Sequence, residues 1–309
     1  MSSGAENLQS APATAESKPQ KPSESECCGS GCKPCVFDIY EQRLKAWEKE
    51  QQRYRLSSEI HNVETLLSPV AYKPFVLRNI QQVTKDSFCY RFCAPTEHPL
   101  NINLGQHVIL RATLQGEEIF RQYTPISDME APGYFDLLIK LYPTGLMSQH
   151  IKEWQLGTVA EFKGPFGSFS ENLLKKWPRL CLLASGTGIA PMSAIVKSIL
   201  NDEDNETVIQ LLFASRFYED ILLKEDIESW ADYWNFRVLY CLSQEQESSN
   251  LDPYEERLHF GRITKTLIES KVEDVANNFF LICGSRVFNK DMANFLTELG
   301  LSEEQYFIF

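Results

Sequence analysis

The spacing of hydrophobic and polar positions changes character near residue 71 and again near residue 179. Between these points, short apolar runs at 75–77, 88–92, 107–111, 134–142 and 158–162 are separated by Gly and Pro. Short strands divided by turn residues are typical of an antiparallel barrel or sandwich. The pattern therefore predicts an antiparallel β domain over residues 71–172.

After residue 178 the apolar runs are separated by longer amphipathic stretches. Strands are expected at 180–184, 208–213, 236–241 and 279–283, and helices after Pro191 and over about 222–230 and 262–269. Strands that alternate with helices indicate a doubly wound parallel sheet. Residues 178–309 are thus expected to form a second, α/β domain.

The chain before residue 71 carries weaker signals. Residues 1–24 have almost no large apolar side chains and are expected to be a disordered tail. A Cys-rich segment at 25–55 follows, and residues 56–70 form a predicted linker. Within the Cys-rich segment a short helix is expected, because its apolar residues recur at helical spacing: Val36, Ile39, Tyr40, Leu44 and Trp47.

Composition favours a soluble globular protein. The 309 residues are 43% hydrophobic and 23% charged, and no apolar run approaches the roughly 20 residues of a membrane helix. We find no signal peptide and expect a soluble cytoplasmic protein without a membrane span. The net charge of −12 argues against nucleic acid as a partner, because nucleic-acid binding usually leaves a basic surface.

A glycine turn marks a candidate nucleotide site. The strand ending at Ser185 breaks at Gly186-Thr187-Gly188, and a helix begins near Pro191. Free N–H groups at such a helix N-terminus can bind a pyrophosphate. An ordinary strand-to-helix turn also uses glycine, and the third glycine of the dinucleotide fingerprint is missing here.

A second candidate lies in the β domain, at residues 121–127. Arg121 and Tyr123 alternate along a predicted strand and should share a face, with Gln122 and Thr124 on the other. A guanidinium suits phosphate and a phenol ring suits packing on a flavin. An exposed strand edge would have the same pattern. Residues 145–148 then open a short helix that could hold another anion.

In combination, these motifs resemble the ferredoxin reductase superfamily, and most closely its cytochrome b5 reductase family. The matching segments appear in the family's order at 121–127, 145–148, 164–167, 186–192, 283–284 and 306–309. The resemblance covers about residues 72–309. The Cys-rich segment resembles an oxidoreductase-like N-terminal domain found on some members.

The resemblance implies a Greek-key FAD-binding barrel followed by an NAD-binding domain. It also implies an enzyme, an FAD-dependent reductase, that transfers hydride from NADH or NADPH to FAD and then single electrons to a haem protein such as cytochrome b5. Carried over by motif, Thr124, Thr187 and Cys283 would lie where flavin and nicotinamide meet. The cofactor-binding residues would be Arg121, Gln122, Tyr123, Thr124, Ser127, Leu138, Lys140, Tyr142, Gly145, Met147, Ser148, Gly186, Thr187, Gly188, Pro191, Ser215, Arg216 and Gly284.

Three positions depart from the family pattern and bear on the hydride donor. Leu146 replaces a lysine, and Ser243 stands where these reductases carry an aspartate that favours NADH. Arg216 follows a predicted strand at a position that holds the 2′-phosphate in NADPH-using relatives. The sequence therefore leaves open which nucleotide is preferred.

The Cys-rich segment supports a separate hypothesis. Cys27, Cys28, Cys32 and Cys35 fall within nine residues, and a Cys-x-x-Cys spacing lets two thiolates reach one zinc or iron-sulfur centre. A reactive or merely flexible cysteine patch is the alternative. The chain could then be a metal-handling or redox-sensing protein, or a binding protein that keeps the reductase fold with little turnover. The histidines show no metal or triad spacing and are expected to be surface or strand residues: His61, His98, His107, His150 and His259.

Overall fold

The computed structural model describes residues 21, 40–41, 44–45, 66–98, 100–246 and 257–309. The chain divides into two compact units, Met1–Glu64 and Thr65–Phe309. In the first unit, the described residues 40–41 and 44–45 are helical, in agreement with the predicted short helix. Cys27, Cys28, Cys32 and Cys35 lie outside the described residues, as do the predicted tail, apart from Lys21, and most of the predicted linker.

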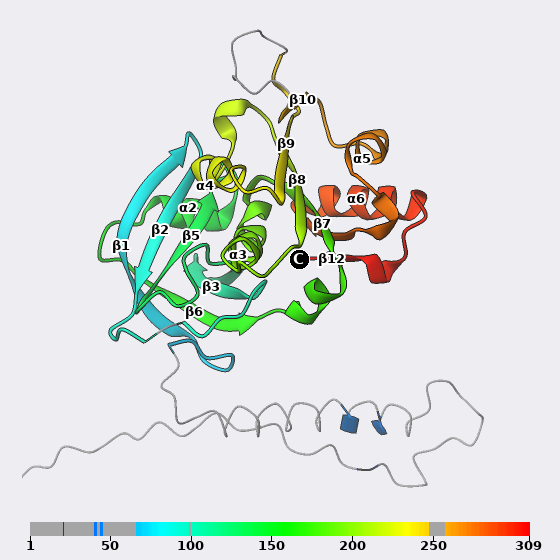
Figure 1. Ribbon diagram of the computed structural model, residues 1–309. Coiled ribbons are helices and arrows are strands. Elements are labelled where there is room, and N and C mark those ends of the chain that lie inside the picture. Colours follow the sequence, from blue (N-terminus) through cyan, green and yellow to red (C-terminus); the bar gives the residue numbers. More distant parts are fainter. Residues whose placement is uncertain (1–20, 22–39, 42–43, 46–65, 99, 247–256) are drawn as a thin grey trace, which may run out of the picture. The chain divides into compact units, whose positions relative to one another are not determined.

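The second unit begins with an antiparallel barrel (Figure 1). Its six strands are ordered β4-β3-β6-β1-β2-β5. A bridge between Pro125 and Leu137 joins the chain just after β4 to β5 and so closes the sheet. The predicted antiparallel barrel is confirmed. The strands are β1 (Lys73–Thr84), β2 (Ser87–Cys93), β3 (His107–Leu114), β4 (Glu117–Tyr123), β5 (Tyr134–Lys140) and β6 (Val159–Phe166), and α2 (Leu146–Lys152) follows β5.

The barrel is filled by aromatic rings. Phe75, Phe92, Phe135 and Phe162 are at most 1% exposed, with ring centroids 4.9 to 5.8 Å apart and mostly edge to face. This offset geometry is the one that aromatic quadrupoles favour. Because successive side chains on a strand point to opposite faces, filling the barrel with one face of β5 leaves its other face directed outward.

The rest of the unit is a six-stranded, wholly parallel sheet ordered β10-β9-β8-β7-β11-β12. The predicted doubly wound sheet is confirmed. Its strands are β7 (Arg179–Ser185), β8 (Val208–Ser215), β9 (Phe236–Leu242), β10 (Leu258–Phe260), β11 (Phe279–Cys283) and β12 (Tyr306–Ile308). The helices are α3 (Ile189–Leu200), α4 (Lys224–Trp230), α5 (Lys265–Lys271) and α6 (Arg286–Glu298). β10, β12 and α6 were not predicted from the pattern of the sequence.

Helices cover both faces of the parallel sheet. On β7, Leu180 and Leu182 pack with α3 and α4, while Cys181 and Leu183 pack with α5 and α6. Strands buried on both faces read as continuous apolar runs, which is why β7 and β11 were evident in the sequence.

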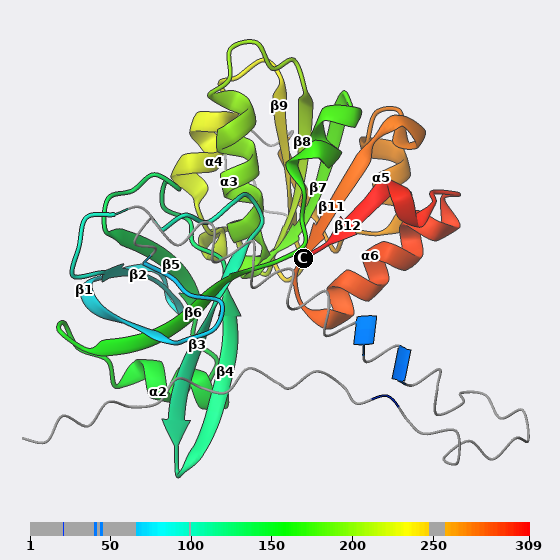
Figure 2. The same ribbon diagram turned by 90° about the horizontal axis from the view of Figure 1, so that it is seen from below.

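The barrel and the sheet share a core. Leu104, Leu138 and Phe169 from the barrel side belong to the same buried cluster as Met192 and Ile195 of α3. Figure 2 shows α3 and α4 between the barrel and the sheet, with α5 and α6 on the far side. The two lobes are therefore held together by hydrophobic burial.

Candidate active site

A cleft of about 880 Å³ lies at the carboxyl ends of the parallel strands and is lined by both lobes. The chain passes from β7 to β8, β9 and β10 on one side, and then returns to β11 on the other side of β7. Open α/β sheets bind ligands at such a switch point, because the loops there diverge and leave a crevice. The ends of β7 and β11 both reach the cleft through Ser185 and Cys283.

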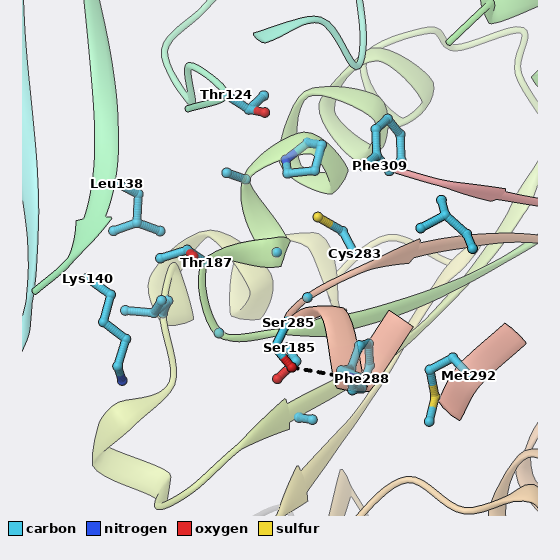
Figure 3. Close-up of a pocket in the computed structure, with 18 of the residues that line it drawn as sticks. Thr124, Leu138, Lys140, Ser185, Thr187, Cys283, Ser285, Phe288, Met292 and Phe309 are labelled. Carbon is cyan, nitrogen blue, oxygen red and sulfur yellow. Dashed lines mark hydrogen bonds between the residues drawn. The ribbon is translucent and has the colours of Figure 1, made fainter. Parts of the chain in front are cut away.

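The barrel supplies one wall of the cleft from β4 and β5 (Figure 3). Leu138 and Lys140 lie on the outer face of β5, opposite the core residues Leu137 and Ile139. Thr124 follows β4, and Figure 3 shows it across the cleft from Cys283 and Phe309. A strand packed on an aromatic core thus fixes an apolar and a cationic side chain at the cleft wall.

The end of β4 departs from the predicted alternation of faces. Gln122, Tyr123 and Thr124 all line the cleft, although neighbours on a strand should face opposite ways. For Thr124 the reason is that β4 ends at Tyr123, so the pleat does not continue through it, whereas Gln122 and Tyr123 both lie within β4. Burial raises the pKa of the Tyr123 phenol, which therefore stays neutral. It offers the cleft a ring and an uncharged hydroxyl.

The glycine turn supplies the facing wall. Gly186 has φ +55°, and a Cβ built on it would meet no heavy atom within 4 Å. Gly188 is the opposite case, because a Cβ there would lie 2.1 Å from the carbonyl oxygen of Cys283. Gly186 therefore keeps the cleft open, and Gly188 lets the turn after β7 approach the end of β11. Thr187 and Pro191 also line the cleft.

Cys283 is a half-buried thiol at the end of β11. Burial raises its pKa to about 12. The thiol is therefore protonated near neutral pH, and it can act on a ligand in the cleft only as a small neutral group.

We expect Cys283 in the protein to be alkylated by iodoacetamide at pH 8 more slowly than glutathione, by a factor on the order of 10 to 100. Its thiolate fraction would be on the order of 10⁻⁴, and the higher nucleophilicity of a basic thiolate offsets only part of that loss. Mass spectrometry of the Cys283 peptide would measure the rate, which should rise steadily from pH 7 to pH 10. A plateau near pH 8 would contradict the raised pKa.

Five predicted cofactor residues are not among those that line the cleft. Met147 is buried in the barrel core, and the buried Ser148 hydroxyl accepts the backbone N–H of Tyr142 at 2.9 Å. The Ser127 hydroxyl accepts the N–H of Asp136 at 3.2 Å. Exposed Arg121 donates from Nη1 to the carbonyl of Phe120 at 2.6 Å. Gly145 precedes α2.

The other predicted residues do line the cleft: Gln122, Tyr123, Thr124, Leu138, Lys140, Tyr142, Gly186, Thr187, Gly188, Pro191, Ser215, Arg216, Cys283 and Gly284.

The cleft also contains residues that sequence analysis did not assign to it. His107, expected to be an ordinary strand residue, begins β3 and lines the cleft, and burial lowers its pKa so that the ring is neutral at pH 7. Phe309 packs against Phe169 at a ring distance of 5.2 Å and also reaches the cleft. No spacing in the sequence could have found His107. Phe309 lies in a recognised motif but had been given no role.

The chemistry of the residues that line the cleft suits a flavin and a nucleotide. Ligand sites are mostly apolar, with a few fixed polar groups. Here Leu138, Tyr123 and Phe309 supply apolar surface, while Thr124 and Thr187 supply hydroxyls. The space in front of Gly186 is one that a side chain would fill. These residues fit FAD on the barrel side and a pyridine nucleotide on the sheet side.

A metal-binding cluster and a membrane-spanning helix are both absent from the part of the chain that the structure describes. No group of three or more His, Cys, Asp or Glu side chains there could hold a metal ion. No helix there is long and apolar enough to cross a bilayer.

Comparisons with known proteins agree with this architecture. Three family profiles match: "Oxidoreductase-like protein, N-terminal" at residues 13–55, "Oxidoreductase FAD-binding domain" at 74–170 and "Oxidoreductase NAD-binding domain" at 182–294. Among solved structures, the cytochrome b5 reductase domain of Ulva prolifera nitrate reductase has the same fold. Its TM-score is 0.68 at 24% identity, covering 79% of this chain and 100% of that domain.

The relatives extend over nearly the whole chain. NADH-cytochrome b5 reductase-like of Mus musculus is 43% identical over 301 residues, which are 94% of this chain and 95% of the relative. The Homo sapiens protein of the same name is 40% identical over 298 residues, 94% of each. NADH-cytochrome b5 reductase 1 of Dictyostelium discoideum is 37% identical over 252 residues, 80% of this chain and 85% of the relative. The resemblance inferred from the sequence is thereby confirmed, and the chain belongs to the NADH-cytochrome b5 reductase family of FAD-dependent oxidoreductases.

Proposed function

We propose that this chain uses NADH or NADPH to reduce an FAD held against its barrel, and passes the electrons to a small haem protein such as cytochrome b5. One observation carries the proposal. The end of β4, with Tyr123 and Thr124, and the glycine turn after β7 open into the same cleft. A flavin on one wall and a nicotinamide on the other would therefore face each other.

The barrel residues would hold the flavin. Tyr123 and Leu138 offer apolar surface to its ring system, and Thr124 offers a hydroxyl at the cleft wall. Arg121 and the free N–H groups at the start of α2 remain candidates for its phosphates. Because Met147 and Ser148 turn their side chains into the protein, they would contribute backbone N–H groups.

The sheet residues would place the nicotinamide. Gly186, Thr187 and Gly188 would accept the nucleotide over the N-terminus of α3, and Cys283 with Gly284 would lie beside the ring. A bound flavin accepts a hydride and releases electrons singly, so no side chain has to act as an acid or base on the nicotinamide. The protein's contribution is orientation and exclusion of water. A protonated Cys283 suits that role because it adds no charge.

The identity of the electron acceptor is a separate part of the proposal. Family names in the comparisons point to cytochrome b5. A donor with a net charge of −12 gains no long-range attraction toward an acidic partner. Association would then depend on a local surface, and its rate should rise with ionic strength, because salt screens the repulsion between two negatively charged proteins.

The relative use of NADPH and NADH is also proposed. Arg216, at the end of β8, would attract the 2′-phosphate of NADPH, and Ser243 supplies no opposing carboxylate. We expect NADPH to be accepted better than by a typical family member. Arg216→Ala should lower the ratio of kcat/KM for NADPH to that for NADH by about tenfold, because a charge-assisted hydrogen bond is lost. A ratio that is far below one and unchanged by this substitution would contradict the assignment.

The visible spectrum of the purified full chain tests the central proposal. We expect flavin absorbance near 450 nm that is bleached by NADH and returns when cytochrome b5 or ferricyanide is added. A colourless protein, or a flavin that neither nucleotide reduces, would exclude the function. Deleting residues 1–60 should leave ferricyanide reduction intact, whereas a metal-handling or sensing role would depend on that segment.

A further inference from the structure

A carboxylate from the barrel lobe reaches across to the nucleotide side of the cleft. Asp86 lies in the turn between β1 and β2. Its Oδ2 accepts a hydrogen bond from Arg216 Nη2 at 2.9 Å and pairs with Lys140 Nζ at 3.0 Å. Its Oδ1 accepts from the hydroxyls of Thr84 at 3.3 Å and Ser87 at 3.1 Å. Asp86 is thus held firmly, and one of its partners belongs to the other lobe.

The same guanidinium nitrogen faces a second carboxylate. Arg216 Nη2 lies 3.3 Å from Asp220 Oδ2, and Lys85 Nζ lies 3.4 Å from Asp220 Oδ1. The Asp220 side chain is only 3% exposed. Both pairs are close enough for charge attraction, yet within the described chain neither Asp220 oxygen has a hydrogen bond of good geometry. Arg216 therefore faces two carboxyl groups.

The Asp86 carboxylate is ionised at neutral pH. Burial opposes its ionisation, but the hydrogen bond and charge of Lys140, the Ser87 hydroxyl and the charge of Arg216 outweigh burial, and its pKa lies below the usual value. A carboxyl whose folded-state pKa is lowered keeps its charge at neutral pH. The pairing with Arg216 is consequently complete throughout the physiological range.

Arg216 stands where a nucleotide's adenosine ribose would lie. In doubly wound sheets the pyrophosphate lies at the first helix N-terminus, and the ribose reaches the end of the next strand. Here that helix is α3, after β7, and the next strand is β8, which ends at Ser215 beside Arg216. Both residues line the cleft. This step rests on the nucleotide binding proposed above.

We propose that Asp86 is a specificity-determining residue that limits the use of NADPH. It holds the Arg216 guanidinium toward the barrel lobe and offsets its charge, so a dianionic 2′-phosphate has to compete with a fixed carboxylate. The substitution Asp86→Asn would keep the shape and an accepting oxygen but remove the charge. The arginine could then turn fully to the phosphate.

Binding of two fragments to the FAD-loaded full chain tests this proposal, because 2′,5′-ADP and 5′-AMP differ only in the 2′-phosphate. Isothermal titration should show that Asp86→Asn tightens 2′,5′-ADP at least about fivefold and changes 5′-AMP less than about twofold, since only the former gains charge attraction. The ratio of kcat/KM for NADPH to that for NADH should rise by a similar factor. When Arg216→Gln is also present, Asp86→Asn should change neither the affinity for 2′,5′-ADP relative to 5′-AMP nor the ratio of kcat/KM for NADPH to that for NADH.

Glu161→Gln is the matched control. Glu161 is also a barrel carboxylate paired with an arginine, Arg111 at 2.8 Å, but neither residue lines the cleft. The Glu161→Gln variant should bind 2′,5′-ADP as the wild type does. Unchanged or weaker 2′,5′-ADP binding in Asp86→Asn would overturn the proposal, as would a gain that survives Arg216→Gln. Since fragment binding needs no turnover, this result is separate from whether NADH reduces the flavin.

Discussion

Replacing Gly188 with alanine is expected to slow hydride transfer from NADH by about 100-fold, the loss that a displacement near 1 Å can cause at a reacting centre. The new Cβ would lie 2.1 Å from the carbonyl oxygen of Cys283, 2.5 Å from its carbonyl carbon and 3.0 Å from the Gly284 nitrogen. All three are backbone atoms, so no side chain can swing aside. The turn after β7 and the end of β11 must separate, which displaces the walls of the proposed nicotinamide site.

The backbone of Gly188 makes the prediction specific to this contact. Its φ of −62° and ψ of −10° suit alanine, so the substitution introduces no backbone strain of its own. We expect overpacking to cost about 1 to 3 kcal/mol of stability. Stopped-flow reduction of the bound flavin and thermal unfolding would measure the two effects.

Gly116→Ala is the control for Gly188→Ala. Gly116 lies in the hairpin between β3 and β4 with φ +85°, and its Cβ would meet nothing within 4 Å. The Gly116→Ala variant should lose roughly 1 to 2 kcal/mol of folding stability to backbone strain and keep the normal rate of flavin reduction. Wild-type rates in Gly188→Ala would show that the two strand ends can separate without disturbing the site.

Tyr123→Ala is expected to weaken FAD binding by about 10- to 100-fold, because the ring is a large apolar surface that would be lost from the cleft wall. Tyr123 also packs against the barrel core, which fixes its position. Fluorescence titration of the apoprotein with FAD would give the affinity, and the ratio of absorbance at 450 nm to 280 nm would report cofactor content.

Tyr123→Phe separates the ring from its hydroxyl. The phenol is neutral in the folded protein, so its loss removes no charge, and we expect FAD affinity within about threefold of wild type. Circular dichroism should show that both variants keep the barrel. FAD affinity that is unchanged in Tyr123→Ala would remove Tyr123 from the proposed flavin site.

Local patterns in the sequence were sufficient to predict the architecture of the two lobes. Strands such as β7 and β11 are continuous apolar runs, and those of the barrel are bounded by turn residues. Two of the missed elements are too short to show such a pattern, since β10 and β12 have three residues each. α6 is different, because Phe288, Met292 and Leu296 recur at helical spacing, and this pattern in the sequence was overlooked.

The candidate site was harder to predict because it depends on contacts between distant segments. The glycine turn and the end of β4 carry local motifs, and both were identified. His107, Asp86 and Asp220 carry none, since each gains its place from a neighbour far away in the chain. The Asp86 to Arg216 pair joins residues 130 positions apart. Conversely, Met147 and Ser148 matched a motif, but local packing turned their side chains inward.

The core shared by Leu104, Leu138, Phe169 and α3 restricts how the enzyme can be redesigned. Chimaeras that join this barrel to the α/β lobe of a relative would bring together apolar surfaces that were shaped for other partners. Close-packed interiors tolerate such mismatches poorly. A successful exchange of nucleotide lobes would therefore have to carry these barrel residues along with α3, so the practical boundary for recombination follows the buried interface rather than the loop between the lobes.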